Sequence, residues 1–277
     1  MKQIFIAVFY LLNFQSLAQS IEANASSWAL SHNTSMRLIV GSGSKNTSVL
    51  SAAIEIKLAP HFKTYWRTPG DSGVPPQISF EGSENLKSAE VLFPAPRIFK
   101  DETGTTAGYK DHTIWPVRIK AQDISKPVIL NVKLDYGVCE KICIPASGTA
   151  KINLNYGEKT EFDAQIAGAE ALVPVKIKLG QGNDLSITKV SNPTIENNHA
   201  VFIVDIAGSQ FVEILPEAKP ESWYLEAHPV SPAGNQFKII VFDPQQARKA
   251  TPCDIRLTVM QKNKAIEVPV RLEGCIE

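Results

Sequence analysis

The sequence predicts an all-β protein built from two β-sandwich domains. Two observations support this expectation: short apolar stretches alternate with polar residues, and turn residues separate these stretches. Strands of this length and spacing, without helical periodicity, are typical of a β-sandwich. The chain length fits two domains of ordinary size or one large β domain.

The N-terminal domain is expected to span residues 19–158. The stretch TPGDSGVPP at residues 68–76 is dense in proline and glycine, which predicts a shaped loop rather than a strand. The predicted strands of this domain cover residues 48–58, 89–93, 113–119, 128–134 and 150–154.

Residues 159–175 have the best helix-forming composition of the chain and predict a linker or a short helix before Pro174. A second β-sandwich domain is expected over residues 176–277. Its predicted strands cover residues 185–190, 200–206 and 237–242, followed by a closing hairpin around a polar turn at residues 262–264.

Residues 1–18 have the features of a secretory signal peptide. Lys2 provides the positive start, an apolar run follows, and Ser16 and Ala18 are the small residues expected before a cleavage site. The apolar run is too short for a comfortable membrane span. The mature protein is therefore expected in an oxidising compartment, where disulfides are permitted.

The charge balance and the histidines exclude several classes of function. Lys and Arg number 28, as do Asp and Glu, so no nucleic acid or anionic membrane is expected as a partner. The 5 histidines are scattered, and the cysteines have no second ligand pair nearby. No metal or other cofactor is expected, and copper is the ion to consider if one were bound.

Cys253 and Cys275 flank the predicted closing hairpin, which would bring them together at its open end. We expect a structural disulfide between them, stabilising the fold by roughly 3 kcal/mol on the chain-entropy model.

Cys139 and Cys143 lie in the segment VCEKICIP. Four residues of extended strand span about 13 Å, whereas a disulfide requires Cα atoms within about 7 Å, so the chain must turn between them if they pair. A crosslink around so small a loop stabilises the fold little, which suits reversible chemistry. The residues alone leave three readings open: a redox pair, a structural staple, or part of a metal site.

A family resemblance rests on three stretches: FKTYWRTPGDSGVPP from residue 62, GYKDHTIWPVRI from residue 108, and DYGVCEKICIP from residue 135. Together they resemble the amino-terminal periplasmic domain of the DsbD/ScsB thiol:disulfide interchange proteins. The resemblance implies an immunoglobulin-like fold for the domain and a periplasmic location. It also implies that Cys139 and Cys143 form a redox-active, catalytic pair.

Two departures from the family are visible. Its best-known members space the active cysteines by five residues, and they shield the disulfide with a cap loop that carries an Asp-Glu pair and an aromatic residue. Asp101 and Glu102 occupy the matching place here, without the aromatic that would follow. Phe99 or Tyr109 is expected to substitute for it. Tyr65 and Trp66 are expected either to line the cysteine site or to fill the core.

The resemblance implies that the chain relays electrons as a component of a protein-disulfide reductase. A membrane-embedded or thioredoxin-like donor, encoded separately, would reduce the Cys139/Cys143 pair, which would then reduce oxidised periplasmic substrate proteins. The alternative is a two-domain immunoglobulin-like binding or chaperone protein whose disulfides are only structural.

Overall fold

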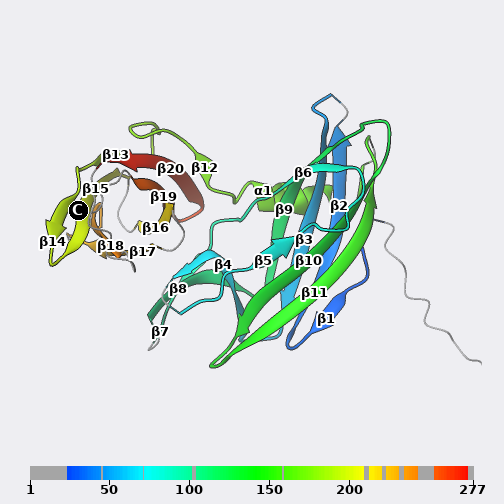
Figure 1. Cartoon of the computed structure of the whole chain (residues 1–277), viewed down its shortest axis with the longest axis horizontal. Coiled ribbons are helices and arrows are strands. Elements are labelled where there is room, and N and C mark those ends of the chain that lie inside the picture. Colours follow the sequence, from blue (N-terminus) through cyan, green and yellow to red (C-terminus); the bar gives the residue numbers. More distant parts are fainter. Residues whose placement is uncertain are drawn as a thin grey trace, which may run out of the picture.

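The computed structural model describes residues 24–44, 46–70, 72–101, 104–157, 159–208, 212–219, 223–230, 234–242 and 253–273. The predicted signal peptide lies outside these residues. Within them, no helix has the length and apolar character needed to cross a membrane. Figure 1 shows two β-rich bodies, which we call the N-terminal lobe (residues 24–170) and the C-terminal lobe (residues 175–273).

The N-terminal lobe contains two sheets. The first has the strand order β1 (Ala29–Ser31), β2 (Thr34–Ser44), β3 (Val49–Leu58), β9 (His112–Ala121) and β6 (Leu86–Val91). The second has the order β11 (Cys143–Leu154), β10 (Val128–Cys139), β4 (Lys63–Gly70), β8 (Gly104–Lys110) and β7 (Arg97–Asp101), with β5 (Gln77–Ser79) pairing β10.

The core of this lobe forms from apolar side chains of both sheets. Because successive residues of a strand point to opposite faces, the alternating pattern of β9 and β10 directs one set of side chains inward. Trp66 and Trp115 are the largest fully buried side chains in this core.

The one helix of the described chain, α1 (Asp163–Glu170), packs on the outer face of the first sheet. Ile166 and the preceding Phe162 are buried there against Ile39 and Ala53. Asp163 accepts hydrogen bonds from the backbone and side chain of Ser42, which fixes the start of the helix to β2.

The C-terminal lobe also contains two sheets around its own core. One has the order β12 (Val175–Lys176), β20 (Lys264–Leu272), β19 (Cys253–Gln261) and β16 (Glu213–Lys219). The other has the order β13 (Ser186–Val190), β15 (His199–Ala207), β18 (Gln236–Phe242) and β17 (Tyr224–Pro229), with β14 (Thr194–Glu196) pairing β15.

A partly buried ion network joins the two lobes. Arg67 of β4 donates to both oxygens of Glu217 in β16 at 3.0 and 2.7 Å, and to Glu267 of β20 at 2.5 Å. Arg256 of β19 donates to the same Glu217 carboxylate at 2.9 and 2.8 Å. Two arginines therefore balance two carboxylates, as burial of charged groups requires.

The network predicts an acid-sensitive contribution to stability. Burial raises the pKa of Glu217, but hydrogen bonds and charges from Arg67 and Arg256 outweigh it and leave the pKa below the usual 4.5. Because the pKa is lower in the folded state than in the unfolded chain, this stabilisation is complete above pH 4.5 and is lost as the pH falls through the folded-state pKa.

We therefore expect the melting temperature to drop between pH 6 and pH 3, and to drop less in Glu217→Gln. Each unit by which the pKa is lowered corresponds to about 1.4 kcal/mol. Thermal unfolding followed by circular dichroism at both pH values checks this. Equal drops in the two proteins would show that Glu217 does not contribute.

The mostly-β architecture agrees with the sequence prediction, as does the presence of several antiparallel sheets. The immunoglobulin-like topology and the exact domain boundaries remain predictions. The strand β4 extends through Gly70, so the first residues of the predicted loop at 68–76 belong to a strand.

Candidate functional site

The two cysteines close the end of a long hairpin. Strands β10 and β11 pair without interruption from Val128 opposite Leu154 to Cys139 opposite Cys143. The chain reverses over residues 140–142, between the two strands. Cys139 and Cys143 form a disulfide, with their Cα atoms 4.1 Å apart. The hairpin register therefore places the two sulfurs side by side.

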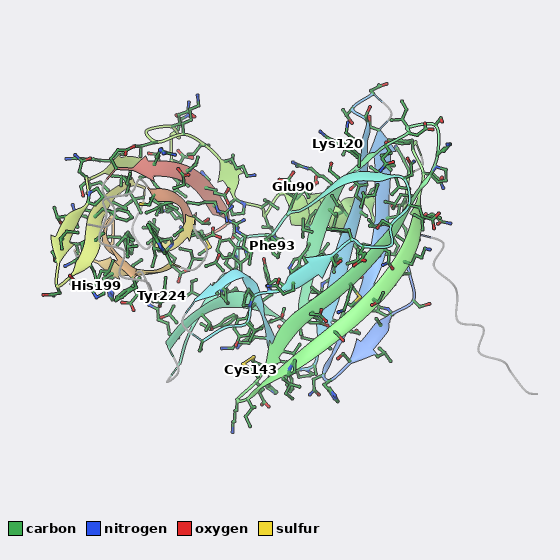
Figure 2. The ribbon with its side chains drawn as sticks, viewed as in Figure 1. Glu90, Phe93, Lys120, Cys143, His199 and Tyr224 are labelled. Atoms are coloured by element: carbon green, nitrogen blue, oxygen red, sulfur yellow. A yellow bond between two sulfur atoms is a disulfide. The ribbon has the colours of Figure 1, made fainter. Side chains whose placement is uncertain are left out.

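The two cysteine residues differ in their exposure to solvent. Cys139 is 1% exposed, whereas Cys143, labelled in Figure 2, is exposed at the end of the hairpin. The neighbouring Ile142 is 76% exposed. An incoming thiol would therefore meet the sulfur of Cys143 first.

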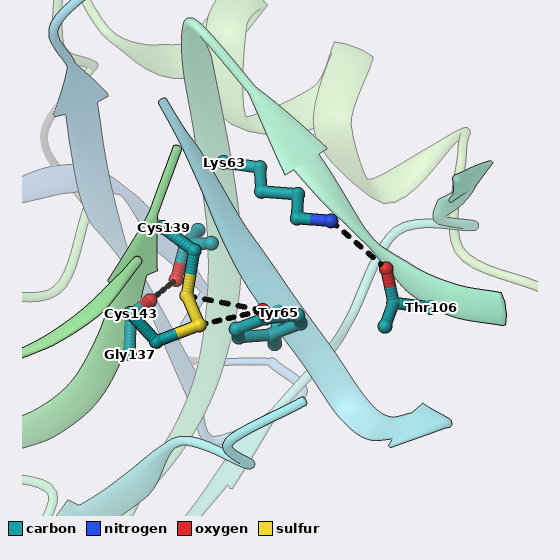
Figure 3. The surroundings of a disulfide bond; sticks show 7 residues. Lys63, Tyr65, Thr106, Gly137, Cys139 and Cys143 are labelled. Carbon is teal, nitrogen blue, oxygen red and sulfur yellow. Dashed lines mark hydrogen bonds between the residues drawn. A yellow bond between two sulfur atoms is a disulfide. The ribbon is translucent and has the colours of Figure 1, made fainter. Parts of the chain in front are cut away.

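Tyr65 contacts both sulfurs. The start of β4 pairs with the end of β10, with Lys63 opposite Cys139 and Thr64 opposite Val138. The Tyr65 hydroxyl donates a hydrogen bond to Cys139 Sγ at 3.0 Å and lies 3.1 Å from Cys143 Sγ (Figure 3). A donor in this position favours negative charge on either sulfur.

The neighbours of Tyr65 hold its strand in place. Thr64 donates its hydroxyl hydrogen to the backbone oxygen of Gly137 at 2.9 Å, which ties β4 to β10. Trp66 points to the opposite face of the strand, into the core. The structure thus divides the adjacent aromatic pair: Tyr65 lines the cysteine site and Trp66 fills the core.

A loop covers the Tyr65 ring. Residues 72–76 follow β4, and a Cβ atom added to Gly73 would lie 2.8 Å from Tyr65 Cδ1. A Cβ added to Gly137 would lie 2.9 Å from Val74 Cβ and 3.3 Å from the Tyr65 ring. Only glycine allows such close approaches, so the loop and β10 enclose the ring between them.

Lys63 extends the site toward β7. Its side chain is 8% exposed, and its ammonium group donates to Thr106 Oγ1 at 3.2 Å. The same nitrogen lies 6.0 Å from the Tyr65 ring centroid and 5.4 Å from that of Phe99. Phe99 therefore joins the site through Lys63. Lys63 was not predicted as a site residue, because KTYWRT lacks the polar–apolar alternation that identifies a strand.

The other predicted cap residues are placed differently. Tyr109 is buried in the core, where its hydroxyl donates to the Pro94 backbone oxygen at 2.7 Å, and the substitution of Phe99 or Tyr109 for the cap aromatic remains a prediction. Asp101 ends β7, and nothing is described of its side chain. Glu102 lies outside the described residues.

The second predicted disulfide is described only in part. Cys253 is fully buried at the start of β19, opposite Leu272 of β20. Cys275 lies outside the described residues, so the Cys253–Cys275 bridge remains a prediction.

Other kinds of site are not evident near the disulfide. Within the described ranges, no group of three or more His, Cys, Asp or Glu side chains is arranged to hold a metal ion. A cavity of about 970 Å³ lies between the lobes, but neither cysteine nor Tyr65 lines it. The disulfide stands at the end of the hairpin, away from the residues that line this cavity.

The sequence of residues 40–154 matches the family model described as "Thiol:disulfide interchange protein DsbD, N-terminal". Over residues 40–154, the chain is therefore similar to the DsbD N-terminal domain family. The matched segment contains the cysteine pair and Tyr65.

The fold is similar to the crystal structure of the N-terminal periplasmic domain of ScsB from Proteus mirabilis. The TM-score is 0.68 and the sequence identity 21%, over 91% of this chain and 100% of that chain. The similarity in fold therefore extends beyond the matched segment into the C-terminal lobe. No curated protein sequence matches this chain.

Proposed function

We propose that the protein relays electrons through the Cys139–Cys143 disulfide in the periplasm. A thioredoxin-like or membrane-embedded donor reduces the pair, and the resulting dithiol reduces disulfides of periplasmic substrate proteins. The observation that carries this proposal is the asymmetry of the disulfide: Cys143 is exposed, while Cys139 is buried and accepts the Tyr65 hydrogen bond.

The first half of the cycle begins at the exposed sulfur. A donor thiolate attacks Cys143 Sγ, and the electron pair of the broken S–S bond leaves on Cys139 Sγ. The Tyr65 hydroxyl already points at this leaving sulfur and stabilises the new thiolate. The second donor thiolate then attacks the donor sulfur of the mixed disulfide and releases Cys143. The donor becomes oxidised, and Cys139 and Cys143 take up two electrons and, at equilibrium, two protons.

The second half reverses the roles. The Cys143 thiolate attacks a substrate disulfide, which forms a mixed disulfide and releases one substrate thiolate. Cys139 then attacks Cys143 Sγ, releases the second substrate thiolate and restores the original disulfide. The substrate gains the two electrons that the donor supplied, so no further cofactor is needed for the balance.

The experiment that tests this cycle uses single cysteine variants. In Cys139→Ser the exposed Cys143 thiol remains without its resolving partner, so we expect it to accumulate covalent adducts with donor or substrate proteins. In Cys143→Ser the remaining thiol is the buried one, so adducts should be at least about tenfold scarcer, as expected for a shielded thiol. Capture from periplasmic and membrane fractions, followed by electrophoresis without reductant, measures both.

The double variant is the control, and reductant should release every adduct. If both single variants fold and neither captures a partner, electron relay is the wrong function. A binding or chaperone protein with structural disulfides would then be the better description.

A further inference from the structure

We propose that the C-terminal lobe sets the reactivity of the disulfide, with Arg67 as the positioning residue that transmits its influence through β4 to Tyr65. The biological meaning of this inference rests on the proposed function. The contacts that support it join β4 to the C-terminal lobe, and all of them lie within the described residues.

The first observation is where the C-terminal lobe is attached. Arg67 lies two residues after Tyr65 on β4, about 7 Å along an extended strand. Its guanidinium group binds the Glu217 carboxylate through two nitrogens and also reaches Glu267. The strand that makes this contact with the C-terminal lobe is thus the strand that carries Tyr65, whose hydroxyl contacts the two sulfurs.

The second observation is that the attachment is specific. Glu217 and Glu267 are 6% and 4% exposed, and within the C-terminal lobe only Arg256 binds Glu217 in the described structure. Without Arg67, two buried carboxylates would share one arginine, which is a costly arrangement. The C-terminal lobe therefore holds Arg67 in one place, with the fixed geometry of a paired guanidinium and carboxylate.

The third observation is that several contacts fix the same stretch of β4. Thr68 donates to Glu217 Oε1 at 2.6 Å, and Leu215 of β16 packs against the core of the N-terminal lobe. The pairing of β4 with β8 is irregular between Tyr65 and Gly70, so the neighbouring strand does not hold this stretch in a regular ladder. The C-terminal lobe supplies the support that regular pairing would otherwise give.

The fourth observation concerns the loop that encloses the Tyr65 ring. β4 ends at Gly70, whose φ of +88° lies in the region that favours glycine, and the chain returns as residues 72–76 over the ring. The network thus anchors the end of β4, the strand from which this loop continues over the Tyr65 ring. Release of Arg67 would let the hydroxyl move off the sulfurs.

The test is the rate at which dithiothreitol reduces Cys139–Cys143 in the full chain, followed by alkylation and mass mapping. We expect Arg67→Gln to slow this reduction by about three- to tenfold, because the leaving sulfur loses its aligned donor. Glu217→Gln changes only the C-terminal lobe and should slow it similarly. Arg118→Gln is the matched control, since Arg118 is a more exposed arginine whose 3.5 Å ion pair with Glu170 lies away from the network.

A double-variant cycle separates positioning from general loosening. If Arg67 acts through Tyr65, Arg67→Gln should cause no further slowing in a Tyr65→Phe background. Unchanged rates in Arg67→Gln and Glu217→Gln, or full additivity with Tyr65→Phe, would overturn the inference. If Arg67→Gln does not fold, Glu217→Gln carries the same cycle. Because dithiothreitol replaces the protein partners, these outcomes are independent of whether the cysteine variants capture any partner.

Discussion

Replacing Tyr65 with phenylalanine is expected to slow the reduction of Cys139–Cys143 by dithiothreitol by about tenfold or more. The reason is the position of the hydroxyl, 3.0 Å from the sulfur that leaves when Cys143 is attacked. A hydrogen bond to a charged group contributes about 1.5–3 kcal/mol, and about 1.4 kcal/mol of barrier corresponds to a tenfold change in rate. Stopped-flow or quenched alkylation kinetics at fixed pH measure the effect.

Tyr109→Phe is the matched control for this experiment. It also removes one buried hydroxyl, but that hydroxyl donates to Pro94 in the core, so the reduction rate should stay within about twofold of the unmodified protein. Equal rates for Tyr65→Phe and the unmodified protein would mean that the hydroxyl does not stabilise the leaving sulfur.

The neighbouring residue gives the largest expected effect on stability. Trp66→Ala should lower the free energy of unfolding by about 3–5 kcal/mol, because a fully buried tryptophan would leave a cavity in the core of the N-terminal lobe. Urea denaturation followed by circular dichroism, with unchanged slope, measures this loss.

Trp66→Phe refines the same prediction. The Trp66 indole N–H is buried and has no hydrogen-bond partner among the described residues, so phenylalanine removes an unsatisfied donor while keeping most of the apolar contact. Its cost should be clearly smaller than that of Trp66→Ala. If alanine and phenylalanine cost the same, the loss does not come from the cavity.

Local patterns predicted the elements that depend on neighbours in sequence. The strand expected at residues 48–58 is β3 (Val49–Leu58), and the hairpin expected around residues 262–264 turns between Gln261 and Lys264. The turn required between Cys139 and Cys143 is also present. Alternation and turn residues are local signals, so a single sequence contains them.

The site itself depends on contacts that no local pattern specifies. Tyr65 reaches the cysteines only because β4 lies between β10 and β8. The sequence alone did not show which of Tyr65 and Trp66 lines the cysteine site. A prediction of which β4 side chains lie on the same face of the sheet as the cysteines requires the register of strands far apart in the chain. The Arg67–Glu217 pair, 150 residues apart, was missed for the same reason.

The continuous pairing of β10 and β11 has a consequence for the lifetime of complexes with partner proteins. The backbone ladder, not the S–S bond, fixes Cys139 opposite Cys143, so the two thiols should remain neighbours after reduction. Well-oriented groups on one molecule can react as if each faced the other at an effective concentration of about 10⁵ M or more. The attack of Cys139 on Cys143 Sγ, which restores the disulfide, should therefore be faster than side reactions of a mixed disulfide. The unmodified protein would then spend most of its turnover time searching for partners and little of it covalently attached to them.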